Sequence, residues 1–132
     1  MSAAKGGLRS ELGRVRGLGS AKEGVRHWWA QRVSAVALIP LSLWFAAHIV
    51  FLTDVDRATA IQWLGSPLTL GLMSLFLIAL TYHAVLGLQV VVEDYIHAKA
   101  AKLVLLLAIQ FAGFALAAAG IVSMLVIAFS GG

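Results

Sequence analysis

The sequence predicts an all-α membrane protein with three transmembrane helices. Of its 132 residues, 61% are hydrophobic and only 12% are charged, and the mean hydropathy is +0.92. A soluble domain of this size cannot hide so many apolar side chains in its interior. The apolar residues also gather into three long runs almost free of charge, and each run is long enough to cross a bilayer as a helix.

The first predicted span covers residues 33–52. Pro40 lies inside it and is expected to kink the helix, because proline lacks a backbone N–H and crowds the preceding turn. Such a kink is tolerated where neighbouring helices satisfy the freed carbonyl. Trp28 and Trp29 precede the span and are typical of the membrane–water interface. We expect no cleaved signal peptide, because no small-residue cleavage site follows the apolar run.

The second and third predicted spans cover residues 67–92 and 103–129. Pro67 suits the first turn of a helix, where the missing N–H has no partner to lose. Both runs exceed the length needed to cross the hydrocarbon, so these helices tilt or extend beyond it. The glycine-containing residues 1–26 are predicted to form a flexible basic tail, and residues 27–132 the membrane-anchor domain.

The charges predict the orientation of the chain. Most of the Lys and Arg residues precede the first span, and two more, Lys99 and Lys102, lie between the second and third spans. The positive-inside rule therefore places the N-terminus in the cytoplasm and the C-terminus in the periplasm. We expect a bacterial cytoplasmic membrane. A mitochondrial inner membrane is the alternative, because the tail contains arginine and few acids, as transit segments do.

Composition excludes several other functions. The chain has no cysteine, which rules out a disulfide scaffold and an iron–sulfur cluster held by this chain alone. The net charge of +4 does not indicate nucleic-acid binding, because the charge is concentrated in a tail beside membrane spans.

His83 is the most informative residue of the second span, which contains no charged side chain. An ionisable group in hydrocarbon is expensive and indicates a functional site by default. Imidazole is also an axial ligand of haem iron. Gly87 lies one helical turn away and leaves room either for a flat group or for a closely packed helix. A structural hydrogen bond is the alternative role of His83.

Asp94 and Tyr95 stand where the second span meets water. They are either an ordinary interfacial pair or a hydrogen-bonding site for the carbonyl of an amphipathic ligand, since a phenol donates while staying neutral. Arg32 begins the first span. It is either a positive-inside anchor or a bidentate partner for the carboxylates of a cofactor.

Other polar or small residues inside the spans are interpreted as structural. His48 is expected to be structural or interfacial, and Gln110 is expected to form a hydrogen bond across helices. Gly113, Ala117 and Gly120 form a stripe at helical spacing that favours close packing.

Two motifs carry a resemblance to a known family. The first is His27-Trp28-Trp29-Ala30-Gln31-Arg32-Val33-Ser34-Ala35, and the second is His83-x3-Gly87-x6-Asp94-Tyr95. With them, residues 25–130 resemble the small hydrophobic membrane-anchor subunit, the D-type cytochrome b anchor, of succinate dehydrogenase, which is respiratory complex II.

The resemblance implies a fold and a set of partners. Two anchor subunits of three spans each form a six-helix bundle, which holds a flavoprotein subunit and an iron–sulfur subunit on the membrane. Succinate is oxidised at the flavin, and ubiquinone is reduced at the membrane edge. The complex works in the respiratory chain and the citric acid cycle, and this subunit catalyses nothing alone.

The resemblance also implies roles for individual residues. His83 matches this subunit's axial ligand to a haem b shared with the second anchor subunit. Tyr95 matches the phenol that hydrogen-bonds the quinone, with Asp94 supporting it, and Arg32 matches a basic position near the haem propionates and the quinone. Two alternatives remain: a cofactor-free structural or assembly subunit, and a small transporter subunit with His83 as a proton relay.

Overall fold

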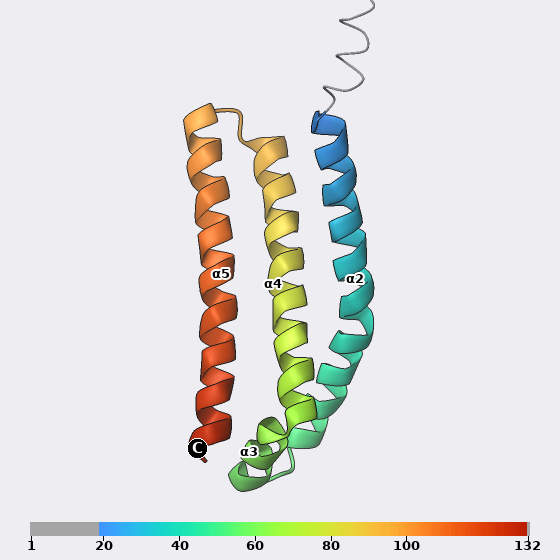
Figure 1. Ribbon diagram of the computed structural model, residues 1–132, viewed down its shortest axis with the longest axis vertical. Helices are drawn as coiled ribbons and strands as arrows, with labels where there is room; N and C mark the ends of the chain where they lie inside the picture. Colours follow the sequence, from blue (N-terminus) through green and yellow to red (C-terminus); the bar gives the residue numbers. More distant parts are fainter. Residues whose placement is uncertain (1–18, 132) are drawn as a thin grey trace, which may run out of the picture. The chain divides into compact units, whose positions relative to one another are not determined.

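The structure is a computed structural model that describes residues 19–131, with side chains from residue 24 onward. Its four helices are α2 (Gly19–Leu52), α3 (Arg57–Gly65), α4 (Pro67–Tyr95) and α5 (Lys99–Ser130) (Figure 1). Three of them, over Gly24–Leu52, Pro67–Tyr95 and Lys99–Ser130, are long and apolar enough to cross a membrane. The predicted fold class and the number and order of the spans are therefore confirmed.

The chain forms two compact units, Met1–Ala30 and Gln31–Gly132, and the second contains most of the three apolar helices. The predicted flexible tail, residues 1–26, lies mostly outside the described residues. The helix α2 begins within it, at Gly19. The flexibility of the remaining tail stays a prediction.

Within the second unit, α4 lies between α5 and residues 31–52 of α2 (Figure 1). The helices α4 and α5 have 29 and 32 residues. At 1.5 Å per residue they are roughly 44 and 48 Å long, against a hydrocarbon thickness of about 30 Å. Both helices therefore extend into the polar boundary of the membrane or tilt within it.

The helix α2 runs without interruption through Pro40. Figure 1 shows it bending towards α4 in the part that follows, which agrees with the expected kink. Proline removes one intrahelical hydrogen bond and leaves a carbonyl exposed on the bend.

The connection between the first two predicted spans contains the short helix α3, which the apolar runs do not predict. Asp56 caps its start by accepting a hydrogen bond from the Thr59 N–H at 3.1 Å. Ser66 follows its end and caps α4 in turn, accepting from the Thr69 N–H at 3.3 Å. Asp and Ser at these positions are the usual signals of helix starts, so the start of this short helix is encoded locally in the sequence.

We predict that α3 loosens in acid. The hydrogen bonds from Thr59 lower the pKa of the exposed Asp56 carboxyl. A lowered pKa stabilises the folded state above the ordinary carboxyl pKa, and this contribution is lost as the pH falls through the lowered value, below about pH 4. The protection factor of the Thr59 amide against hydrogen exchange, taken relative to the intrinsic rate at each pH, should fall across that range. An Asp56→Asn variant, which caps without titrating, should lack the transition; the same fall in that variant would contradict the assignment.

Glycines allow α4 and α5 to pack closely. A Cβ added at Gly113 would overlap Val85 Cγ2 and come within 3.4 Å of Thr81 Cγ2, and one added at Gly120 would overlap Leu77 Cδ2. The predicted small-residue stripe is thus confirmed as a packing surface. Association of helices in lipid depends on such van der Waals contact rather than on a hydrophobic driving force.

We predict that Gly113→Ala destabilises the protein more than Gly120→Ala. Val85 is β-branched and stiff at χ1, whereas the end of the Leu77 side chain can rotate away. Overpacking costs about 1–3 kcal/mol. Thermal unfolding in detergent should show the larger loss for Gly113→Ala. Gly71→Ala is the control, because nothing lies within 4 Å of its Cβ; equal losses at Gly113 and Gly71 would contradict the packing role.

The buried interior of the described chain is small. Four apolar side chains have 9% or less of their surface exposed, namely Leu41, Leu86, Val92 and Met124, while many large apolar side chains are more than half exposed. A surface of this kind suits contact with lipid or with other apolar helices rather than with water.

Candidate functional site

His83 and Ser34 form the centre of the candidate site. His83 lies within α4, and Ser34 lies on α2, 49 positions earlier in the sequence. The Ser34 Oγ is 3.0 Å from His83 Nδ1 and also donates to the Gln31 carbonyl oxygen at 3.0 Å. Ser34 is buried, with 6% of its surface exposed, and His83 is half-buried. The spacing of residues within a single helix does not predict this pair, because its two members lie on different helices.

The His83 side chain lines an open hollow of about 400 Å³ between α4 and α2. The rest of the lining comes from α2 and is mostly apolar: Ala35, Leu38, Ile39, Ser42 and Leu43. The second ring nitrogen of His83, Nε2, has no hydrogen-bond partner among the described residues. An imidazole with one nitrogen held and the other free beside an apolar hollow has the chemistry of a metal ligand.

Gly87, one turn after His83, lies under the Gln31 side chain. A Cβ added at Gly87 would meet only Gln31 Nε2, at 3.8 Å. Gly87 is therefore not a close helix-packing position like Gly113, and the flat gap expected beside His83 is closed only by a flexible amide. The Gln31 Oε1 is buried and has no hydrogen-bond partner within the described residues.

Asp94 and Tyr95 end α4 and are both exposed, Tyr95 by 76%. They lie roughly 18 Å along the helix from His83, given 1.5 Å per residue. The structure therefore holds two separate groups: His83 with Ser34, and Asp94 with Tyr95. Arg32 is close in sequence to the group of His83 and Ser34. It is an exposed residue of α2, two positions before Ser34.

The connection that follows Tyr95 is short and charged on both sides. Only residues 96–98 separate α4 from α5. The exposed acids Glu93 and Asp94 stand in the last turn of α4, and Lys99 and Lys102 stand in the first turn of α5. These signs are opposite to those that stabilise helix ends.

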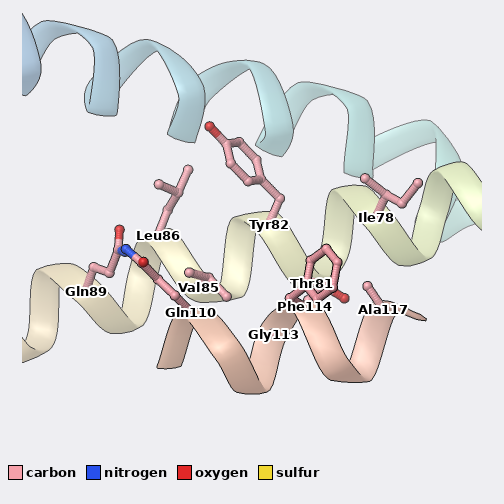
Figure 2. A pocket seen from close by; sticks show the side chains of 10 residues that line it. All are labelled: Ile78, Thr81, Tyr82, Val85, Leu86, Gln89, Gln110, Gly113, Phe114 and Ala117. Carbon is pink, nitrogen blue, oxygen red and sulfur yellow. The ribbon is translucent and has the colours of Figure 1, made fainter. Parts of the chain in front are cut away.

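A second groove, of about 350 Å³, lies between α4 and α5 (Figure 2). It is mostly apolar and was not predicted; its lining residues are Ile78, Thr81, Tyr82, Val85, Leu86, Gln89, Gln110, Gly113, Phe114 and Ala117. Gln89 and Gln110 bring their amides to the same end of it (Figure 2). The predicted cross-helix hydrogen bond of Gln110 is not found among the described residues.

His48 has a structural environment at the other end of α2. Its Nδ1 donates to the Trp44 carbonyl oxygen at 2.8 Å, since a carbonyl can only accept. Its ring lies 4.7 Å from that of Trp44 and 5.2 Å from that of Trp63, which joins α3 to the same aromatic cluster. These contacts agree with the structural interpretation of His48.

The described residues contain no group of three or more His, Asp or Glu side chains arranged to hold a metal ion. His83 is the candidate ligand of this unit on the grounds of its chemistry and its place beside the hollow.

Comparison with known proteins bears on this arrangement. Residues 7–117 match the model of the family described as succinate dehydrogenase/fumarate reductase transmembrane subunit. The chain is similar to the succinate dehydrogenase hydrophobic membrane anchor subunit of Rickettsia bellii (strain RML369-C), with 35% identity over 78% of this chain and 82% of that protein. It is also similar to the protein of the same name from Paracoccus denitrificans, with 31% identity over 83% of this chain and 84% of that protein.

The match extends across all of α2, α3 and α4 and into α5, so it includes both motifs that carry the resemblance. The three apolar helices and the family match together confirm the predicted family. The chain belongs to the succinate dehydrogenase/fumarate reductase transmembrane subunit family.

Proposed function

We propose that this protein anchors the flavoprotein and iron–sulfur subunits of succinate:ubiquinone oxidoreductase to the membrane, together with a second anchor subunit. The names of its relatives support the anchoring role. The exposed apolar surfaces of its helices support a second anchor, because a three-helix unit with so few buried side chains leaves its faces for other membrane helices. The proposed place is a bacterial inner membrane with the N-terminus in the cytoplasm.

We propose that His83 is an axial ligand of a haem b shared with the second anchor subunit. The single observation that carries this role is the position of the ring: Nδ1 is held by Ser34, and the side chain borders an apolar hollow. Gly87 has no side chain, and only the flexible Gln31 side chain lies over it. Together they leave room for a planar group beside α4. When bound, a haem supplies one-electron redox chemistry.

Arg32 is proposed to pair with the haem propionates or to stand close to the quinone. It is exposed on α2 within one turn of Ser34. A guanidinium pairs with carboxylates bidentately and remains charged in any environment that a membrane surface offers. Its alternative role is a positive-inside anchor.

Tyr95 is proposed to donate a hydrogen bond to a carbonyl of ubiquinone, with Asp94 supporting the site. The exposure of Tyr95 at the end of α4 supports this role, because a ligand can reach the phenol from outside the chain. The apolar surface of α4 leads away from that end and suits an isoprenoid tail.

We predict that His83→Ala abolishes the low-spin b-type haem signal of the purified complex, because the variant removes the iron ligand. A dithionite-reduced minus oxidised optical spectrum measures the change. His48→Phe is the matched control: it removes another histidine of the apolar helices while keeping an aromatic ring beside Trp63, and should keep the signal. A full haem signal in the His83 variant would favour the cofactor-free anchor.

We predict that Tyr95→Phe lowers ubiquinone reduction by about tenfold, the effect of one lost hydrogen bond of about 1.4 kcal/mol. Succinate oxidation by an artificial dye acceptor should be unchanged, since the flavin site lies in another subunit. Tyr82→Phe is the control, because this tyrosine lines the separate groove between α4 and α5. Equal loss of both activities would indicate failed assembly, and full quinone reduction would remove Tyr95 from the site.

A further inference from the structure

Ser34 carries a hydroxyl whose two contacts are not equivalent. Its oxygen is 3.0 Å from the Gln31 carbonyl oxygen and 3.0 Å from His83 Nδ1. A carbonyl oxygen can only accept a hydrogen bond, whereas a hydroxyl has one proton to donate and two lone pairs to accept with. The contact with Gln31 therefore takes the only proton of Ser34.

The remaining contact then fixes the state of the imidazole. A hydroxyl that has donated its proton to Gln31 can meet His83 only by accepting from an Nδ1–H. A neutral imidazole carries one ring proton, so Nε2 is left with its lone pair. This is the tautomer that a metal ligand needs, because iron binds at a nitrogen without a proton.

We propose that Ser34 is the positioning residue of His83: it selects the Nδ1–H tautomer and holds the ring so that Nε2 faces the hollow between α2 and α4. This inference rests on the proposed haem ligation. It adds a role for a residue of α2 that touches no cofactor itself. Gln31 takes part through its backbone carbonyl, which keeps the Ser34 proton away from His83.

The surroundings of Ser34 suit this role. Ser34 is buried, so water does not compete strongly for Nδ1. The back-bond to a carbonyl one turn earlier on the same helix restricts the serine rotamer. Because Ser34 is on α2 and His83 is on α4, the pair also sets the rotation of one helix relative to the other within this unit.

The test compares haem properties of the assembled complex with and without the hydroxyl. In Ser34→Ala the imidazole N–H loses its acceptor, and the ligand becomes a weaker electron donor. We expect an upward shift of the haem midpoint potential, an altered low-spin electron paramagnetic resonance signal, and retention of haem weakened by about 10- to 100-fold. The haem-to-flavin ratio of the purified complex reports retention without reference to activity.

Two further variants distinguish a role of Ser34 in positioning His83 from a role in the stability of the protein. Ser34→Thr keeps the hydroxyl and should restore the wild-type potential and signal. Ser123→Ala removes a serine that also bonds to a carbonyl of its own helix, Ala119, but has no histidine partner, and it should change nothing. A Ser34→Ala complex with unchanged potential, signal and haem content would overturn the proposal.

If Ser34→Ala prevents assembly, Ser34→Cys replaces it, since a thiol is a weak acceptor of similar size. A raised potential in the Cys variant supports the positioning role, and a wild-type potential overturns it. The outcome of His83→Ala distinguishes the two proposals. If that variant keeps its haem signal, the ligand assignment itself fails; if it loses the signal while the Ser34 variants match the wild type, only the positioning role fails.

Discussion

A histidine inside an apolar helix must have a hydrogen-bond partner, and the arrangement of this unit follows from that need. A polar group left unsatisfied in hydrocarbon is expensive. His83 meets the requirement through Ser34, and Ser34 meets its own through the backbone of Gln31. One face of α2 is thereby fixed against α4, and the hollow that the two helices share has the His83 side chain at its edge.

The two contacts of α4 with its neighbours differ in kind. Towards α5 it packs closely, because Gly113 and Gly120 leave room for the Val85 and Leu77 side chains of α4. Towards α2 it leaves an open hollow beside His83 and places only a flexible amide over Gly87. The α4–α5 contact is therefore closely packed, and the contact of α4 with α2 is open beside His83. With so few buried apolar side chains, the described residues leave most of their apolar surface for lipid or for other apolar helices.

The sequence predicted the features that depend on composition and on spacing within one helix. Three spans follow from long apolar runs, and the packing stripe of Gly113 and Gly120 follows from helical periodicity. The pairing of Ser34 with His83 joins positions far apart in the chain, so no local pattern contains it. The groove containing Tyr82 likewise depends on how two helices meet. The helix α3 is a different case, because its start carries a local signal: Asp56 is a residue type that commonly caps helices.

The charged turn between α4 and α5 is a point of local frustration. Acids at the C-terminal end of α4 and lysines at the N-terminal end of α5 each oppose the helix dipole, by about 0.3–1 kcal/mol per charge at an exposed site. Sequences tend to avoid such conflicts between local preference and overall fold, except where a surface serves another purpose. A partner that brings compensating charges to this turn would relieve the conflict. Binding of such a partner and stabilisation of these two helix ends would then be thermodynamically linked.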